Sequence, residues 1–189
     1  VEVLNTPAYA GNGRDQNILG RSVNSLFGFV ADGLFQTQAE VDAHATQPGR
    51  GLGRIRYQDL DKNGIINAFD QQYIGVADPD FTYGINLGLT YRGFDFALFL
   101  QGVQGINVQN VYKTLTDMAF QWSGSNWGRR TLDAWTPTNT SSTIPALSLT
   151  DRNNEVRPST YFVEDGSYAK LRNLQLGYSL PAALISRLK

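Results

Sequence analysis

The sequence predicts an all-β fold: part of a large antiparallel transmembrane β-barrel with long extracellular loops and short helical turns. Three observations support this prediction. Two stretches around one tight turn alternate between apolar and polar residues, their apolar set is aromatic at the ends and aliphatic in the middle, and a third stretch near the C-terminus repeats the alternation. Alternation with aromatic girdles is typical of strands that cross an outer membrane.

A β-hairpin is predicted at residues 81–102, with strands near 81–91 and 94–102. A period of two is that of a strand and not of a helix. Arg92-Gly93 can form a two-residue turn, with glycine where a positive φ is needed. The resulting register keeps the two apolar sets on one face, with Leu87 opposite Leu98. The apolar positions of the first strand are Phe81, Tyr83, Ile85, Leu87, Leu89 and Tyr91.

The third predicted strand covers residues 168–180 and ends before Pro181. Its shared apolar face is formed by Leu174, Leu176, Tyr178 and Leu180. The hairpin alone is equally compatible with a soluble β-sandwich that has one face in its core. The long stretches 36–80 and 103–160 both lie opposite the short turn at Arg92-Gly93. Long loops on one side and short turns on the other favour the membrane barrel.

Composition excludes several classes of function. The chain has 189 residues, of which 17% are charged, and a formal net charge of −1. This balance gives no basic footprint, so we expect no nucleic-acid partner. Cysteine is absent, which excludes disulfides and thiolate metal sites within these residues. The sequence has no run of 18 apolar residues, so no transmembrane helix is predicted.

Residues 59–70 match the twelve-residue calcium loop of EF-hands. Carboxylate and amide oxygens at this spacing converge as the loop curls, Gly64 occupies the sharp turn at position 6, and Ile66 is the apolar residue at position 8. We therefore predict a structural Ca²⁺ site. Its ligands at positions 1, 3, 5, 7, 9 and 12 would be Asp59, Asp61, Asn63, Ile65, Asn67 and Asp70.

Two features distinguish this loop from an EF-hand. Position 12 is Asp70 instead of the longer glutamate, and residues 53–58 before the loop read as a strand and not as a helix. One helical turn is expected afterwards, at residues 69–74. Such an isolated loop would bind calcium weakly, on the order of 10⁻⁴ to 10⁻³ M. A polar turn without metal is the alternative interpretation.

The segment 103–160 lacks strand alternation and contains the tryptophans of the chain, with a short helix expected at residues 112–120. Long inserts in compact folds are usually functional. The indoles could stack on sugars, contact a partner or pack the loop on itself. The candidate substrate residues are Trp122, Trp127 and Trp135.

We predict no enzymatic activity and therefore no catalytic residues. Ser167 and Lys170 match an S-x-x-K motif, but they begin an alternating strand, and the S-D-N and K-T-G partners of that motif do not occur. Glu164 and Asp165 are adjacent and would point to opposite faces of a strand, unlike a glycosidase pair.

Three stretches resemble the C-terminal part of SusC/RagA-like TonB-dependent transporters. They are GRIRYQDLDKNGIINAFDQQYIGVADPDFTYGINLGLTYRGFDFALFLQGVQG, the Trp135-Thr136-Pro137 segment, and Arg157-Pro158-Ser159 leading into FVEDGSYAKLRNLQLGYSLP. The resemblance implies that residues 1–189 are part of one 22-stranded barrel in the outer membrane of a Gram-negative bacterium. It also implies import of oligosaccharides or peptides, energised through TonB, under a SusD-like surface lipoprotein that acts as a lid.

The sequence departs from that family pattern in extent. The family's plug domain and TonB box are not found in these residues, and too few strands are predicted to close a barrel, which needs at least eight. We therefore expect a fragment whose plug lies elsewhere. The alternative function is a secreted β-domain with a dockerin-like calcium loop, acting as a carbohydrate-binding or adhesion module. The face of Ile85, Leu87, Leu98 and Leu100 distinguishes the two, because it would contact lipid in the first and protein in the second.

Overall fold

The computed structural model describes residues 21–121, 124 and 126–181. These residues form two compact units. The first, called here the loop unit, takes its described residues from 1–77 and 108–164. The second, called the strand unit, takes them from 78–107 and 165–189.

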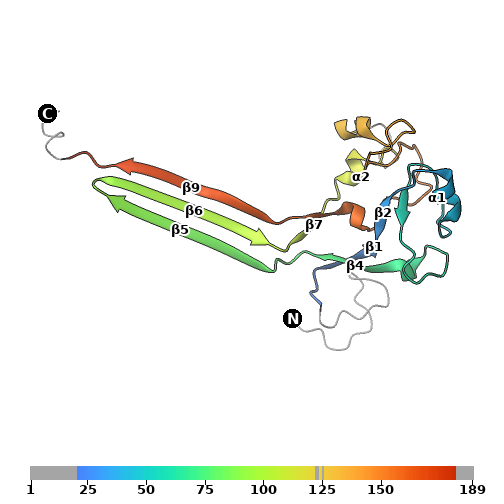
Figure 1. Ribbon diagram of the computed structural model, residues 1–189, viewed down its shortest axis with the longest axis horizontal. Coiled ribbons are helices and arrows are strands. Elements are labelled where there is room, and N and C mark those ends of the chain that lie inside the picture. The colour runs from blue at the N-terminus through green and yellow to red at the C-terminus, as the bar shows by residue number, and fades with distance from the viewer. Residues whose placement is uncertain (1–20, 122–123, 125, 182–189) are drawn as a thin grey trace. The chain divides into compact units, whose positions relative to one another are not determined.

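The strand unit is one antiparallel sheet of β5 (Phe81–Tyr91), β6 (Phe94–Gln104) and β9 (Tyr168–Tyr178). Its order is β5-β6-β9, so β6 lies between the other two strands (Figure 1). The hairpin has the predicted register, with Leu87 opposite Leu98. The second strand continues two residues beyond its predicted end, and the third ends at Tyr178 instead of residue 180.

The turn at Arg92-Gly93 sets this register. Both residues have positive φ angles, 47° and 85°. Two positive φ angles are the signature of a type I′ turn, whose twist matches that of the flanking strands. The Gly93 carbonyl also accepts a hydrogen bond from the Ser179 N–H at 2.7 Å.

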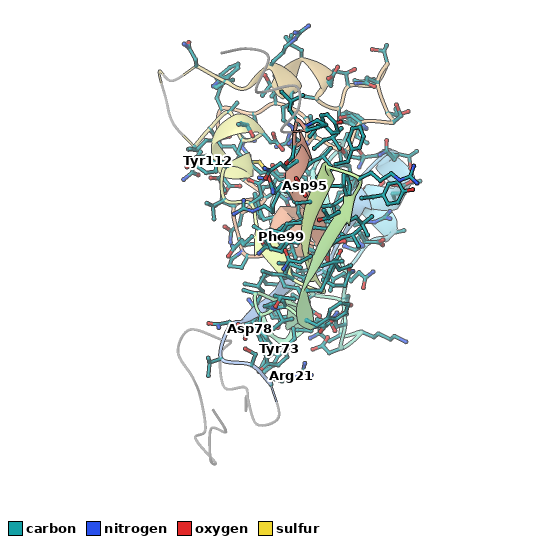
Figure 2. The ribbon with its side chains drawn as sticks, turned by 90° about the vertical axis from the view of Figure 1, so that its left-hand side faces the viewer. Arg21, Tyr73, Asp78, Asp95, Phe99 and Tyr112 are labelled. Carbon is teal, nitrogen blue, oxygen red and sulfur yellow. The ribbon has the colours of Figure 1, made fainter. Side chains whose placement is uncertain are left out.

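The sheet has one apolar and one mostly polar face, and its apolar face is exposed. Leu87 is 45% exposed and Leu176 is 73% exposed. On the other face the bulky Phe99 is opposite Asn86, and its ring lies against Gly84. Asp95 lies on the same face, four residues earlier along β6 (Figure 2).

A β-bulge interrupts the alternation of β9. Leu174 is opposite Leu98, but Leu171, not residue 172, is opposite Leu100. One extra residue is thereby inserted at Arg172-Asn173. Because side chains alternate with a period of two, the bulge reverses the face assignment of every residue before it. The alternation of residues 168–180 does not by itself indicate this irregularity.

The loop unit consists of short elements around one core. β1 (Ser25–Phe29) pairs with β4 (Gln71–Val76), and β2 (Ala31–Leu34) pairs with β3 (Ile55–Tyr57). Its helices are α1 (Gln38–Ala43), α2 (Lys113–Thr116) and the 3₁₀ turns η1 (Ala68–Asp70), η2 (Arg129–Asp133) and η3 (Thr160–Phe162). The buried core cluster is Phe29, Leu34, Ile55, Tyr57, Ile66, Met118, Trp135 and Phe162.

The helices of the loop unit are shorter than the sequence predicts. The Thr37 side chain caps α1 by accepting the Glu40 N–H at 3.2 Å, and Glu40 Oε2 accepts the Gln36 N–H at 2.8 Å. The helix expected at residues 112–120 is observed as α2, which covers only Lys113–Thr116. The helical turn expected at 69–74 is present only as η1, which ends at Asp70, because β4 begins at Gln71 and pairs with β1. No helix in the described part of the chain is both long and apolar enough to cross a bilayer.

A pair of short strands lies at the base of the long insert between β6 and β9. β7 (Asn107–Gln109) pairs with β8 (Val163–Asp165). The Asn110 N–H donates to the Phe162 carbonyl at 2.7 Å, and the Gly166 N–H donates to the Ile106 carbonyl at 2.9 Å. Backbone hydrogen bonds therefore bring the two ends of the insert together.

Buried polar groups join β3 to the segment around Glu155. The Gln47 amide donates to the Asn153 side chain at 2.6 Å and to the Ile55 carbonyl at 2.7 Å. Glu155 is 1% exposed, accepts the Ile55 N–H at 2.9 Å, and pairs with Arg54 at 2.8 Å. Burial raises the pKa of the Glu155 carboxyl, and the Arg54 guanidinium and the Ile55 N–H oppose that rise.

Candidate functional site

The predicted calcium loop lies between β3 and β4. Lys62 and Gly64 have positive φ angles of 58° and 82°, which curl the chain sharply. Ile66 is buried in the core, as predicted for position 8. Its N–H donates to the Thr46 carbonyl, and the Thr46 N–H donates to the Gly64 carbonyl, so the outer side of the loop is held by backbone hydrogen bonds.

Three carboxylates converge inside the loop. One oxygen each from Asp59, Asp61 and Asp70 lies within 4.8 Å of the other two. Asp61 is exposed, Asp59 is half-buried and Asp70 is buried. Hard oxygen ligands gathered in this way suit Ca²⁺.

Asp70 differs from the other two in its role. Its Oδ1 accepts the Leu60 N–H at 2.8 Å and its Oδ2 accepts the Asn67 N–H at 2.7 Å. It thereby closes the loop and caps η1 together with Asn67. A carboxylate oxygen has more than one acceptor site, so each of these oxygens can also face a cation.

The remaining predicted ligands bond to one another. The Asn63 Oδ1 accepts the Ile65 N–H at 2.8 Å, and the Asn67 Nδ2 donates to the Ile65 carbonyl at 3.1 Å. The Asn67 Oδ1 accepts the Phe69 N–H at 2.8 Å, so this side chain serves the helical turn. The donor set that fits a metal best is therefore Asp59, Asp61 and Asp70.

Backbone N–H groups of the loop stabilise the negative charge of the Asp59 carboxylate. Desolvation works against ionisation of Asp59, but the N–H groups of Gly64 and Asn63 and the Asp61 side chain together keep the Asp59 pKa below its usual value. The Gly64 N–H donates to Asp59 Oδ2 at 2.8 Å. Asp59 is thus favoured in the anionic form that a cation would need.

The tryptophans occupy different environments. Trp135 is buried in the core cluster, and its indole N–H donates to Gln36 Oε1 at 2.8 Å. Trp127 is 45% exposed. Trp122 lies outside the described residues. Trp135 therefore packs the loop unit, and Trp127 is the described indole with surface available to a ligand.

The structure also contains a depression that the sequence analysis missed. It measures about 470 Å³ and lies beside the bulge of β9, where Gln101, Tyr168, Ala169, Lys170 and Arg172 line it. No sequence pattern predicts this depression, because strict alternation places Lys170 and Arg172 on the apolar face with Leu174.

Comparison with known proteins gives the family. TonB-dependent receptor P3 of Formosa agariphila (strain DSM 15362 / KCTC 12365 / LMG 23005 / KMM 3901 / M-2Alg 35-1) is 35% identical over 172 residues, which cover 89% of this chain and 16% of the relative. TonB-dependent receptor P26 of the same strain is 31% identical over 171 residues, which cover 90% of this chain and 17% of that relative.

The chain belongs to the TonB-dependent receptor family. It spans about 16% of the length of the curated relatives that it matches. No protein-family model matches the sequence. The printed names of both relatives describe receptors.

Solved structures show the fold of this receptor segment. The RagAB peptide transporter aligns with a TM-score of 0.64 and 20% identity, over 86% of this chain and 16% of that one. The RagAB peptide importer in its closed-closed state aligns with a TM-score of 0.60 and 21% identity, over 88% of this chain and 17% of that one. The all-β fold predicted from the alternating strands is confirmed.

Proposed function

We propose that the chain is part of the barrel wall and outer loops of an outer-membrane transporter. The observation that carries this proposal is the exposed apolar face of the strand unit. Each strand has eleven residues, which matches the ~9–11 that a tilted transmembrane β-strand needs. Fully burying one leucine side chain is worth about 1.5–3 kcal/mol, so a face of this extent needs an apolar environment.

The edges of the sheet support the same proposal. β5 and β9 are long edge strands, and within the described residues neither has a partner on its outer side. Exposed edges of this length invite aggregation, whereas further strands in a closed barrel would satisfy them. The strand predictions 81–91, 94–102 and 168–180 then belong to the wall, and stretches 36–80 and 103–160 to the extracellular loops.

The full-length receptor would import oligosaccharides or peptides, energised through TonB, with a SusD-like lipoprotein as its lid. Support comes from the family and from the name of the RagAB peptide transporter. Fluorescent oligosaccharides and peptides should enter cells that express the full-length receptor, and deletion of TonB should stop entry. Entry that continues without TonB would contradict the proposal, and co-purification of a surface lipoprotein tests the lid.

The secreted β-domain with a calcium loop is the second candidate. It requires the face of Ile85 and Leu87 to pack on protein, but these residues are 53% and 45% exposed. Among the described residues that face therefore favours lipid as its partner.

We also propose that Asp59, Asp61 and Asp70 bind one structural Ca²⁺, with further oxygens from the loop. Replacing Asp59 and Asp61 together by alanine is expected to abolish calcium-dependent protection of the full-length receptor. Trypsin cleavage after Lys62, compared in millimolar Ca²⁺ and in chelator, measures this directly because Lys62 lies inside the loop. Asp42→Ala, on the exposed side of α1, is the control and should keep the protection. If calcium gives the unmodified receptor no protection, the metal proposal is wrong.

A further inference from the structure

The bulge in β9 decides which face of the sheet carries two cations. With uninterrupted alternation, Lys170 and Arg172 would share the face of Leu174, which is apolar. The extra residue instead places Lys170 opposite Gln101, and leaves Leu171 opposite Leu100 on the apolar side. A cation on the lipid face of a barrel is destabilising, and the bulge keeps Lys170 off that face.

Both cations line the depression of about 470 Å³ on the polar face, together with Gln101 and Tyr168. Within the described residues neither Lys170 nor Arg172 takes part in an ion pair, unlike Lys113, which pairs with Glu164 at 2.8 Å. Two adjacent, exposed and unneutralised cations attract an anion.

The nearest acidic group on the polar face of β6 is too distant to neutralise them. Asp95 is opposite Gly177, whereas Gln101 is opposite Lys170. Six residues along a strand correspond to roughly 20 Å, and the four residues from Asp95 to Phe99, which is opposite Asn173 beside Arg172, correspond to roughly 14 Å. Charges farther apart than about 8–10 Å are largely screened at physiological ionic strength.

We propose that Lys170 and Arg172, with Gln101 and Tyr168, form a subsite for an anionic group, carboxylate or sulfate, on the transported solute. This subsite rests on the proposed function, because the polar face lines the solute path only if the apolar face contacts lipid. Arg172 supplies a fork of N–H donors that matches a planar or tetrahedral oxyanion, and Lys170 supplies a compact point charge. The Gln101 amide can donate a further hydrogen bond.

The test uses pyranine, a soluble trisulfonated pyrene, and the purified full-length receptor in detergent. Fluorescence anisotropy should report binding that inorganic sulfate displaces and that weakens as ionic strength rises. Replacing Lys170 and Arg172 together by glutamine should weaken binding by about tenfold or more, which is about 1.4 kcal/mol. If the double variant does not assemble, Lys170→Gln and Arg172→Gln singly should each weaken binding about threefold.

The matched control removes two other exposed cations, with Arg92→Gln and Arg129→Gln together, and should change the affinity less than about twofold. Equal loss in the control, unchanged affinity in the subsite variants, or no pyranine binding by the unmodified receptor would overturn the subsite. Uptake separates this result from the proposed function. A receptor that imports its solute but fails these binding tests lacks the subsite alone, whereas one that binds pyranine through Lys170 and Arg172 but imports nothing contradicts transport.

Discussion

Replacing Leu87 with arginine is expected to block assembly of the full-length receptor in the outer membrane. Leu87 lies in the middle of β5, on the apolar face and opposite Leu98. An arginine at the bilayer midplane costs about 2–4 kcal/mol. Heat-modifiable migration on gels, which reports a folded barrel, should be lost or greatly reduced in outer-membrane fractions.

Asn86→Arg is the matched control for that experiment. It adds the same charge one residue away, but Asn86 is opposite Phe99 on the other face of the sheet. We expect this variant to reach the membrane and to show the normal heat-modifiable shift. Normal insertion of the Leu87→Arg receptor would refute the assignment of that face to lipid.

Replacing Glu155 with alanine is expected to destabilise the loop unit by about 3 kcal/mol, the lower end of the range for breaking a buried ion pair. The change leaves Arg54 without its partner and the Ile55 N–H without its acceptor. The lower end applies because burial already raises the Glu155 pKa, so the native pair does not fully offset its desolvation.

Hydrogen exchange in the full-length receptor measures this effect. Amides of β3 should exchange much faster in the Glu155→Ala variant. Glu164→Ala is the control, because Glu164 is 45% exposed and its ion pair with Lys113 should contribute at most about 1 kcal/mol. If both variants leave the exchange of β3 unchanged, the buried polar groups around Glu155 do not hold the loop unit together.

The strand unit was largely predictable because its signals are local. A period of two over eleven residues and a turn with glycine at its second position fix one register for the hairpin, and the structure has that register. The bulge at Arg172 was not predictable, because it depends on how β9 pairs with a strand far away in the sequence. Without pairing information, Leu171 and Leu174 cannot be placed on the same face.

The ligand positions of the candidate cation site were predictable from the motif, but the hydrogen bonds of its ligands were not. The positions of Asp59 and Asp61 follow from the motif, and the buried Ile66 follows from its position in the loop. That Asp70 would cap η1 depends on β4 beginning directly after it, where a helical turn was expected. The burial of Trp135 beside Gln36 likewise reflects a contact between residues 99 positions apart.

The pairing of β7 with β8 has a consequence for how receptors of this kind can diversify. Because backbone hydrogen bonds hold the ends of the insert, its exposed positions, such as Trp127, can change without altering how β6 pairs with β9. We expect related receptors to differ at these exposed positions, and so in the ligands that they contact, while they keep buried residues such as Trp135 and Glu155.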